Sequence, residues 1–354
     1  MTLGGIDHRG LVSGQHRGLA AALARSVLRL ASGVYGIGQA LDRLGYDLSI
    51  KTVNHADVPV ICIGNITTGG TGKTPIVCDV CRRLRERGLR VAIISRGYGG
   101  LDDGQNDEAK ELYARLPDVP HVQDPNRHAA ALVATQELES EIIVMDDGYQ
   151  HRRLFRDVNV LVVDATCPFG FGYLLPRGYL REPLSAIRRA DAVIITRADQ
   201  VDGSVVTAIE AQVRRWNPSA PIATTEHAPV RLVDCRGDSQ PITRVENQPV
   251  AVLSAIGNPD AFEATVTSMG AIVAARRDLP DHHPYDRPTR DSLREWINAL
   301  GEGPETPTFV LCTRKDLVKL QTDRIAGVPV LAVEIDLHWR DGLDAVWEAI
   351  EECY

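Results

Sequence analysis

The residues of this chain that could carry out chemistry begin with Lys73 and Thr74, which close a loop rich in Gly and Thr. Residues 58–63 before the loop form an apolar, β-branched run, typical of a strand buried on both faces, and residues 76–87 after it have a helical pattern. In a P-loop the backbone N–H groups cradle phosphates, the lysine reaches the β- and γ-phosphates, and the hydroxyl binds Mg²⁺. The arrangement predicts a nucleotide-binding loop.

This loop departs from the usual spacing G-x-x-x-x-G-K-[ST]. Thr67 stands where the first glycine is expected, and Gly69 and Gly70 supply the flexibility instead. The alternative is a chance glycine-rich turn before an ordinary helix, which the strand, loop and helix context disfavours. The predicted nucleotide-binding residues are Thr67, Thr68, Gly69, Gly70, Thr71, Gly72, Lys73 and Thr74.

Two adjacent carboxylates, Asp146 and Asp147, directly follow another apolar run at residues 141–145. Neighbouring carboxylates are costly to place together unless a cation compensates their charge. P-loop enzymes use an apolar strand that ends in Asp to hold the Mg²⁺ shell. These residues and Thr74 are therefore the predicted metal site, and the alternative for the two carboxylates is a solvated turn.

The elements that must position these groups indicate an α/β protein. Further strands are expected at residues 90–95, 158–164 and 192–196, with helices between them. The predicted fold is a P-loop NTPase-like α/β/α domain with a second, smaller α/β domain. We expect an N-terminal tail and helix in residues 1–50, the P-loop core domain in residues 51–225, and a linker with the smaller domain in residues 226–354. Residues 217–248, which span the border between the last two parts, are rich in Pro, Thr and Asp and are predicted to connect the domains.

Composition agrees with a globular protein of this size. The chain has 354 residues, of which 44% are hydrophobic and 24% are charged. The net charge of −8 argues against nucleic acid as the main partner. The seven cysteines are scattered, and several lie in apolar runs, as buried thiols do in a reducing compartment.

Residues 18–46 have apolar side chains at helical spacing, with Arg25, Arg29 and Arg43 between them. The longest charge-free run, residues 30–41, is too short for a bilayer span, which needs about 20 residues. The pattern fits a helix lying in a membrane interface and equally a helix packed on the protein's own core. It leaves both alternatives open.

A set of short motifs, in order along nearly the whole chain, resembles the tetraacyldisaccharide 4′-kinase family. The motifs are residues 64–67, 69–75, 95–99, 107–108, 146–152, 180–184 and 281–285. Tyr149 stands where the family usually has Phe, and Arg314 stands where it usually has Glu. The second departure leaves open the role of residues 313–316, which only loosely resemble the base-reading loop of GTPases, as do residues 196–199.

The resemblance implies a transferase of lipid A biosynthesis. The expected reaction is ATP- and Mg²⁺-dependent phosphorylation of the 4′-hydroxyl of a tetraacylated glucosamine disaccharide 1-phosphate. The resemblance also implies a glycolipid substrate, a bilayer contact through the N-terminal helix, and a peripheral position at the cytoplasmic face of the inner membrane. A substrate that stays in the bilayer favours the membrane alternative for residues 18–46.

The resemblance also assigns roles to individual residues. A sugar hydroxyl must lose a proton as it attacks, so a carboxylate within hydrogen-bond reach is required. Asp107 is the expected general base, supported by His282 with Asp281 behind it, and Lys73 acts on the phosphates. The residues expected to bind substrate are Asn65, Arg96, Gln150, Arg181 and Glu182.

Two alternative functions would also use a P-loop. A P-loop ATPase switch or metallochaperone would act on a protein partner, but such proteins carry a second lysine where this chain has Thr68. A soluble kinase or ligase of a small metabolite would not need the Arg-bearing amphipathic segment at the N-terminus. Both rivals are therefore disfavoured relative to the lipid kinase.

Overall fold

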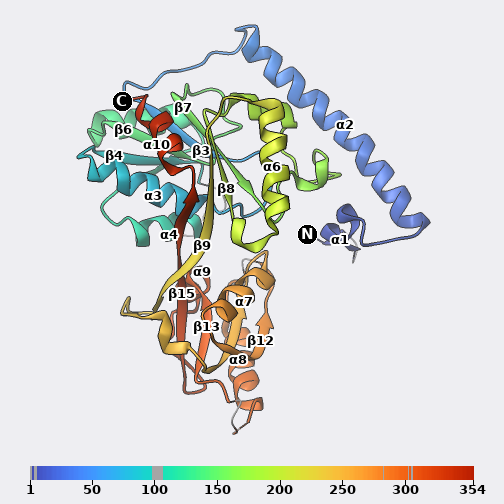
Figure 1. Ribbon diagram of the computed structural model, residues 1–354, viewed down its shortest axis with the longest axis vertical. Helices are drawn as coiled ribbons and strands as arrows, with labels where there is room; N and C mark the ends of the chain where they lie inside the picture. The colour runs from blue at the N-terminus through green and yellow to red at the C-terminus, as the bar shows by residue number, and fades with distance from the viewer. Residues whose placement is uncertain (1, 4–5, 98–106, 282, 302, 304–305) are drawn as a thin grey trace. The chain divides into compact units, whose positions relative to one another are not determined.

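The computed structural model describes residues 2–3, 6–97, 107–281, 283–301, 303 and 306–354 (Figure 1). Contacts divide the chain into two compact units. Unit 1 contains Met1–Glu226 and Trp339–Tyr354, and unit 2 contains His227–His338. Each unit is described by itself.

Unit 1 is built on a sheet with the strand order β9-β8-β7-β3-β6-β4-β5, in which neighbouring strands are parallel. The strands are β3 (Val60–Gly64), β4 (Val91–Ser95), β5 (His121–Gln123), β6 (Ile142–Asp146), β7 (Val158–Asp164), β8 (Ala192–Thr196) and β9 (Ile222–Val233). β3, β4, β6 and β8 are buried along their whole length, as their apolar runs predict. Because the strands are parallel, their carboxyl ends meet at one edge, where ligands of such sheets bind.

The helices of unit 1, together with this parallel sheet, confirm the predicted α/β class. They are α1 (His8–Ser13), α2 (Leu19–Asp47), α3 (Lys73–Glu86), α4 (Asp107–Arg115), α5 (Arg127–Leu132), α6 (Gly203–Trp216) and α10 (Leu343–Glu351), and a small hairpin joins β1 (Thr2–Leu3) to β2 (Ile6–Asp7). α3 begins earlier than the expected residue 76. Pro75 is accommodated in its first turn, where the missing N–H has no helical partner to lose.

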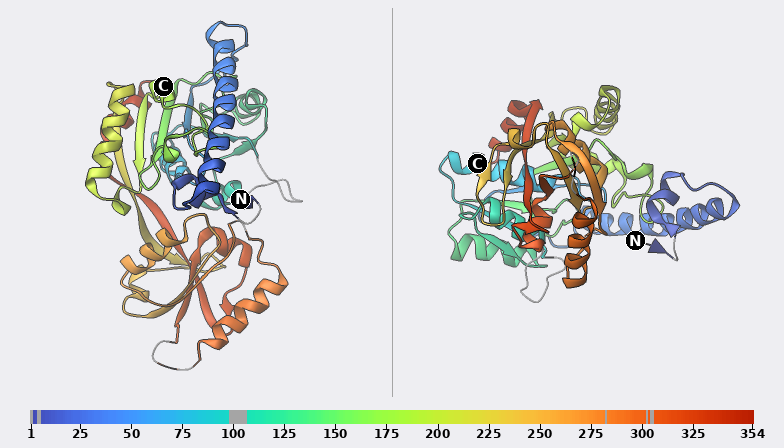
Figure 2. Two further views of the ribbon diagram at one scale, coloured as in Figure 1. Left: turned by 90° about the vertical axis from the view of Figure 1, so that its right-hand side faces the viewer. Right: turned by 90° about the horizontal axis from the view of Figure 1, so that it is seen from below.

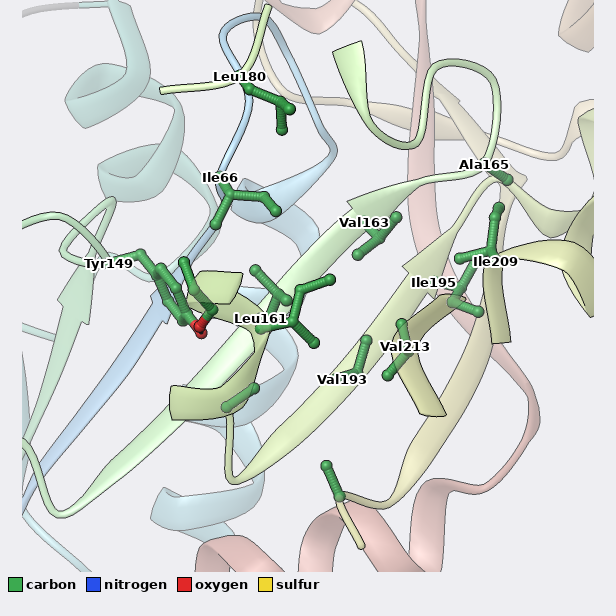
Figure 3. Packing of buried hydrophobic residues seen from close by; sticks show 14 residues of the cluster. Ile66, Tyr149, Leu161, Val163, Ala165, Leu180, Val193, Ile195, Ile209 and Val213 are labelled. Carbon is green, nitrogen blue, oxygen red and sulfur yellow. The ribbon is translucent and has the colours of Figure 1, made fainter. Parts of the chain in front are cut away.

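One face of the unit 1 sheet is covered by α5 and α6. In the parallel register Cys62 lies opposite Met145 and Asn159, so the side chains of Cys62, Met145 and Leu161 share a face. Alanines of α5 pack on the Cys62 side of this face, and Ile209 and Val213 of α6 pack on the Leu161 side (Figure 3). Short parallel strands with helices on their faces thus bury the apolar runs completely.

Unit 2 contains a smaller parallel sheet with the strand order β12-β11-β13-β15. Its strands are β11 (Pro249–Ser254), β12 (Ile272–Asp278), β13 (Phe309–Thr313) and β15 (Val328–Asp341), with β14 (Arg324–Ile325) antiparallel to β15 and β10 (Ser239–Gln240) antiparallel to β9. Its helices are α7 (Pro259–Ser268), α8 (Arg287–Ala299) and α9 (Arg314–Leu320). β9 and β15 each contain a boundary between the two units.

Two expectations about the domain borders are wrong in detail. Residues 217–248 do not form a plain connection, because they include β9, whose Thr and Val side chains favour extended backbone. The predicted smaller domain, residues 226–354, includes Trp339–Tyr354, which belong to unit 1. There the Trp339 Nε1–H donates to Asp79 of α3 at 3.0 Å, and the guanidinium of Arg87 lies 4.6 Å from the centre of the Trp347 ring.

α2 is one uninterrupted helix (Figures 1 and 2). Its apolar stripe is exposed to solvent: Leu30 is 76% exposed and Val34 is 72% exposed. The opposite side contacts the segment 174–181 of the same unit, since Ser32 Oγ donates to the Leu174 carbonyl at 2.8 Å and Tyr35 OH donates to the Arg181 carbonyl at 2.9 Å. The alternative that this stripe packs on the protein's own core is therefore wrong. Among the described residues, none of the helices combines the length and hydropathy required to cross a membrane.

Candidate active site

Two glycines give the phosphate loop its shape. Gly72 takes a left-handed conformation (φ 78°) directly before α3, which L side chains rarely adopt. At the end of β3, a Cβ on Gly64 would lie 2.7 Å from the Cβ of Tyr149 and 2.8 Å from its backbone nitrogen. Only glycine at position 64 lets the loop after β6 approach the loop after β3 this closely.

Neighbouring segments brace this loop by hydrogen bonds to its backbone. The buried Thr196 hydroxyl at the end of β8 donates to the Thr71 carbonyl at 2.9 Å. On the other side the Thr68 N–H donates to the Tyr179 carbonyl at 2.8 Å, and the Arg181 N–H donates to the Ile66 carbonyl at 2.7 Å. The loop backbone is therefore held by the surrounding protein, as a preorganised anion cradle requires.

Lys73 and Asp147 form the centre of the site. The Lys73 ammonium lies 3.2 Å from Asp147 Oδ1 and 3.4 Å from Asn65 Oδ1. The Arg181 guanidinium binds the other carboxylate oxygen of Asp147 at 3.0 Å and the side-chain oxygen of Gln150 at 3.4 Å. The Gln150 amide in turn donates to the Asn65 carbonyl at 2.7 Å. The structure thus brings together five of the residues expected from the sequence.

The charges at this centre balance one another. Burial opposes ionisation of Asp147, but Lys73 and Arg181 outweigh it and lower the pKa of the carboxyl group. The carboxylate is therefore ionised at neutral pH and aligns both cations. Asp147 itself has a left-handed backbone (φ 51°), which is strained for a residue with a side chain and is typical of functional sites.

Asp146 and Thr74 supply the oxygen atoms that suit Mg²⁺. Asp146 is the last residue of β6, lies opposite Ile63 of β3, and is only 5% exposed. Thr74 is half-buried in the first turn of α3. Within the described residues no group of three or more His, Cys, Asp or Glu side chains could hold a metal ion. Mg²⁺ in nucleotide sites needs only one or two carboxylates, because phosphate oxygens and water complete its shell. The residues present fit such an ion.

Glu182 and Tyr149 support the floor of the site. The buried Glu182 carboxylate accepts a hydrogen bond from Arg189 at 2.6 Å and lies 3.6 Å from Arg152. Tyr149 packs beside Ile66 in the core beneath the loop (Figure 3), and its hydroxyl donates to the Ala186 carbonyl at 2.9 Å. Because the added hydroxyl is satisfied, Tyr in place of the family's Phe is accommodated.

Sequence reasoning missed Arg127 at the start of α5. It is 3% exposed, donates to the Asp124 carbonyl at 2.9 Å, and among the described residues its Nε atom has no hydrogen-bond partner. Burial and the charge of Arg96 lower its pKa to about 10, while Asp147 and Asp146 oppose this, so the group stays charged at neutral pH. No motif marks Arg127; the only local signal is Asn126, which caps the helix at that point.

Arg96 and His151 lie within the electrostatic reach of Arg127. Arg96 is exposed just after β4, where the sequence places it. Burial, followed by the charge of Arg127, lowers the pKa of His151 to about 4, so its ring is neutral at physiological pH. Positive charge therefore accumulates beside the carboxylates at the sheet edge, as an anionic ligand requires.

The structure does not test the predicted base. Asp107 begins α4, but its side chain lies outside the described residues, as does all of His282. Asp281 belongs to unit 2 and is exposed. The assignment of these three residues stays a prediction.

Comparison with known proteins gives one family. The family model described as LpxK, tetraacyldisaccharide-1-P 4′-kinase, matches residues 24–352. A tetraacyldisaccharide 4′-kinase of Anaeromyxobacter sp. (strain Fw109-5) is 37% identical over 347 residues, which cover 93% of this chain and 92% of that protein. The corresponding protein of Geobacter sulfurreducens is 35% identical over 346 residues, with 93% and 94% covered.

A solved structure agrees with these sequence relatives. The crystal structure of LpxK from Aquifex aeolicus in complex with ATP superimposes with a TM-score of 0.73 at 27% identity, covering 94% of this chain and 100% of that one. The alternative of a switch ATPase or metallochaperone is therefore not supported. The matched model, the extent of both relatives and the shared fold together establish that this chain belongs to the tetraacyldisaccharide 4′-kinase family.

Proposed function

We propose that the site around Lys73 and Asp147 is where this protein binds ATP and Mg²⁺ and transfers the γ-phosphate to its glycolipid substrate. As a member of its family, the protein is an ATP-dependent kinase of lipid A biosynthesis that phosphorylates the 4′-hydroxyl of a tetraacylated disaccharide 1-phosphate. The observation that carries the site assignment is the Lys73 ammonium at the head of α3, held 3.2 Å from a carboxylate at the end of β6.

The nucleotide side of the site follows from the P-loop geometry. The N–H groups of the loop and of the first turn of α3 bind phosphate oxygens, and Lys73 contacts the β- and γ-phosphates. Thr74 and Asp146 are the residues that would hold Mg²⁺, which supplies positive charge against the phosphates. Asp147 keeps Lys73 and Arg181 aligned, so that little reorganisation is needed when the nucleotide enters.

The acceptor side is assigned to residues around the same centre. Asn65, Gln150 and Arg181 form one hydrogen-bonded group that can orient hydroxyl or phosphate oxygens, with Glu182 behind it and Arg96 at the rim. Asp107 removes the proton of the attacking hydroxyl, and His282, backed by Asp281, supports it. Arg127 adds a fixed positive charge next to the carboxylates.

We also propose that α2 rests on the cytoplasmic face of the inner membrane, with the protein bound peripherally. Its exposed apolar residues would enter the interface, as in other amphipathic interfacial helices. Beside them, the guanidinium groups of Arg177 and Arg29 lie 4.3 and 5.4 Å from the centre of the Tyr173 ring. Two cations next to an apolar helix suit the anionic headgroups of a bilayer.

The catalytic activity can be tested directly. The purified protein should transfer phosphate from ATP to a detergent-dispersed tetraacyldisaccharide 1-phosphate and form a product with one additional phosphomonoester, detected by mass spectrometry. Without Mg²⁺ the transfer should stop. ATP hydrolysis that is indifferent to the glycolipid, or transfer to a protein or a soluble sugar instead, would contradict the proposal.

The membrane contact has its own test. Replacing Leu30 and Val34 together by Glu should greatly weaken binding to vesicles that contain phosphatidylglycerol, because two charges would have to enter the interface. Both residues are exposed, so thermal stability should change little. Turnover of glycolipid presented in vesicles should fall with binding, whereas ATP affinity should stay the same.

The matched control makes the same change at exposed apolar residues of unit 2. Val230 is 47% exposed and Ile272 is 55% exposed. Replacing this pair by Glu should leave vesicle binding unaltered. Equal loss of binding in both double variants would show that overall charge, rather than α2, governs association.

A further inference from the structure

Unit 2 buries a carboxylate with no assigned role. Asp316, in the first turn of α9, is 1% exposed and accepts three hydrogen bonds. Tyr285 OH donates to its Oδ1 atom at 2.8 Å, the Ala255 N–H donates to the same oxygen at 3.2 Å, and the Thr313 hydroxyl donates to Oδ2 at 2.6 Å. A carboxylate this deeply buried is costly unless its partners are fixed in place.

These partners identify what Asp316 holds together. Ala255 follows β11, Thr313 ends β13, and Tyr285 ends the loop that carries Asp281 and His283. One side chain therefore ties the carboxyl ends of two strands to this loop. Because Asp316 is buried and both of its oxygens accept hydrogen bonds from the protein, its carboxylate is not available to bind a base, unlike the Asp of a base-reading loop.

Tyr285 is held as firmly as Asp316. It is 1% exposed and has a left-handed backbone (φ 54°), a conformation that persists only when the surroundings enforce it. Its carbonyl accepts a hydrogen bond from Arg290 at 2.8 Å, and its N–H donates to His283 Nδ1 at 3.0 Å. Burial and the nearby Asp316 charge raise the pKa of the Tyr285 hydroxyl, so that it remains a hydrogen-bond donor.

The other end of the loop is also anchored. The Leu279 N–H donates to the carbonyl of Ser254, the last residue of β11, at 2.8 Å, and the Ser254 hydroxyl donates to Asp278 at 3.2 Å. The segment between Leu279 and Tyr285 is thus fixed at both ends on the same part of the unit 2 sheet. Within it lie Asp281 and His282.

We infer that Tyr285 and Asp316 are positioning residues for phosphoryl transfer, because their hydrogen bond fixes the loop from which Asp281 and His282 act. The inference rests on the catalytic role proposed for His282. It adds the residues that hold the loop carrying His282 in place. The position of this loop matters for kcat, because a misplacement of a reacting group by about 1 Å can lower the reaction rate 10²-fold.

The decisive variant is Tyr285→Phe, which removes one hydroxyl from an otherwise unchanged ring. We expect kcat to fall by about 10- to 100-fold, because the loop loses its anchor. The KM for ATP should stay at its original value, since neither residue is assigned to phosphate. Asp316→Asn keeps the shape and an acceptor oxygen for Tyr285, so it should lose less activity and serves as the second variant if Tyr285→Phe folds poorly.

The matched control is Thr265→Val in α7. Thr265 is also buried in unit 2, but its hydroxyl donates to the Ala261 carbonyl of its own helix at 2.9 Å rather than to the loop. It should lower the unfolding temperature comparably and leave kcat unaltered. Equal losses of kcat in Thr265→Val and Tyr285→Phe would reduce the effect to general destabilisation and overturn the inference.

Combination with His282→Ala separates the inference from the role on which it rests. The Tyr285→Phe/His282→Ala double variant should be no slower than His282→Ala alone, because the anchor acts through that loop. Losses that multiply would overturn the inference. Normal kcat in Tyr285→Phe beside an impaired His282→Ala would also overturn it while leaving the role of His282 intact. Normal kcat in His282→Ala would refute that role itself, and the inference with it.

Discussion

Replacing Lys73 by Met should lower kcat for phosphoryl transfer by about 10³-fold or more, the scale seen when one preorganised charge is removed from a transition state. The side chain keeps its length and apolar stem, so the loop retains its packing. Asp147 keeps its 3.0 Å contact with Arg181, which limits the cost of leaving its carboxylate without the ammonium. Single-turnover measurements at saturating ATP would isolate the chemical step.

A suitable control is Lys319→Met in α9, which makes the same change away from the P-loop and should behave as the unmodified protein. The unfolding temperature of Lys73→Met should stay close to that of the parent. Substantial residual transfer with undiminished ATP affinity would refute the assignment of this lysine to the β- and γ-phosphates.

Replacing Asp107 by Ala should cost kcat roughly 10²–10⁴-fold, the usual span for loss of a general base. His282→Ala should have an effect of similar size if the two residues act as one unit. The double variant should then be scarcely slower than the poorer single variant, because groups that act together are not additive. ATP affinity should be unaltered in all three, since neither residue is assigned to the phosphates.

The control for Asp107 is Asp118→Ala, which removes another carboxylate of unit 1 that is exposed and forms a surface ion pair with Arg85. Surface pairs of this kind contribute little, so its turnover should be normal. Multiplied losses in the Asp107/His282 double variant would indicate independent roles. Near-normal kcat in Asp107→Ala would make Asp146 or Asp147 the better candidate for the base.

The centre of the site was predictable because its residues follow short strands buried on both faces. A continuous apolar run such as Ile142–Asp146 shows where a parallel strand ends, and the polar residues directly after it must lie at the edge of the sheet. Asp147 was predicted in this way, Lys73 from the P-loop pattern, and Gln150 from the family resemblance. The structure links all three through Arg181, which contacts Asp147 and Gln150, while Lys73 contacts Asp147. Asp107 and His282 carry no such positional signal, so their roles depend on family resemblance alone.

Arg127 could not be predicted for a physical reason. Its significance comes from burial next to carboxylates that lie far from it in the sequence, and neither burial nor that neighbourhood is encoded in the residues around it. Asp316 is a similar case. The sequence showed a strand followed by a polar loop but gave no sign that its carboxylate would point inward to Tyr285.

Elements whose neighbours in the fold are distant in the sequence were only partly predictable. The period of α2 was clear, yet the same apolar stripe serves a core or a membrane, and only the exposed side chains exclude the core. α10 lies beside the end of α3, but nothing in its own sequence indicates that neighbour. β9 was hidden because it lies within residues 217–248, whose several Pro residues indicated a connection rather than a strand.

The stretch from Leu174 to Arg181 affects which hydroxyl of the acceptor the transferable phosphate can reach. It is hydrogen-bonded to α2 through Ser32 and Tyr35 and to the phosphate loop through Ile66 and Thr68. It therefore acts as a spacer of constant length between the apolar helix and the transferable phosphate. If α2 lies on a bilayer, that phosphate is carried at one height above the acyl chains. A sugar hydroxyl at that height is within reach of the phosphate, and one buried deeper in the bilayer is not. The distance of a hydroxyl from the acyl chains would therefore determine which one accepts the phosphate.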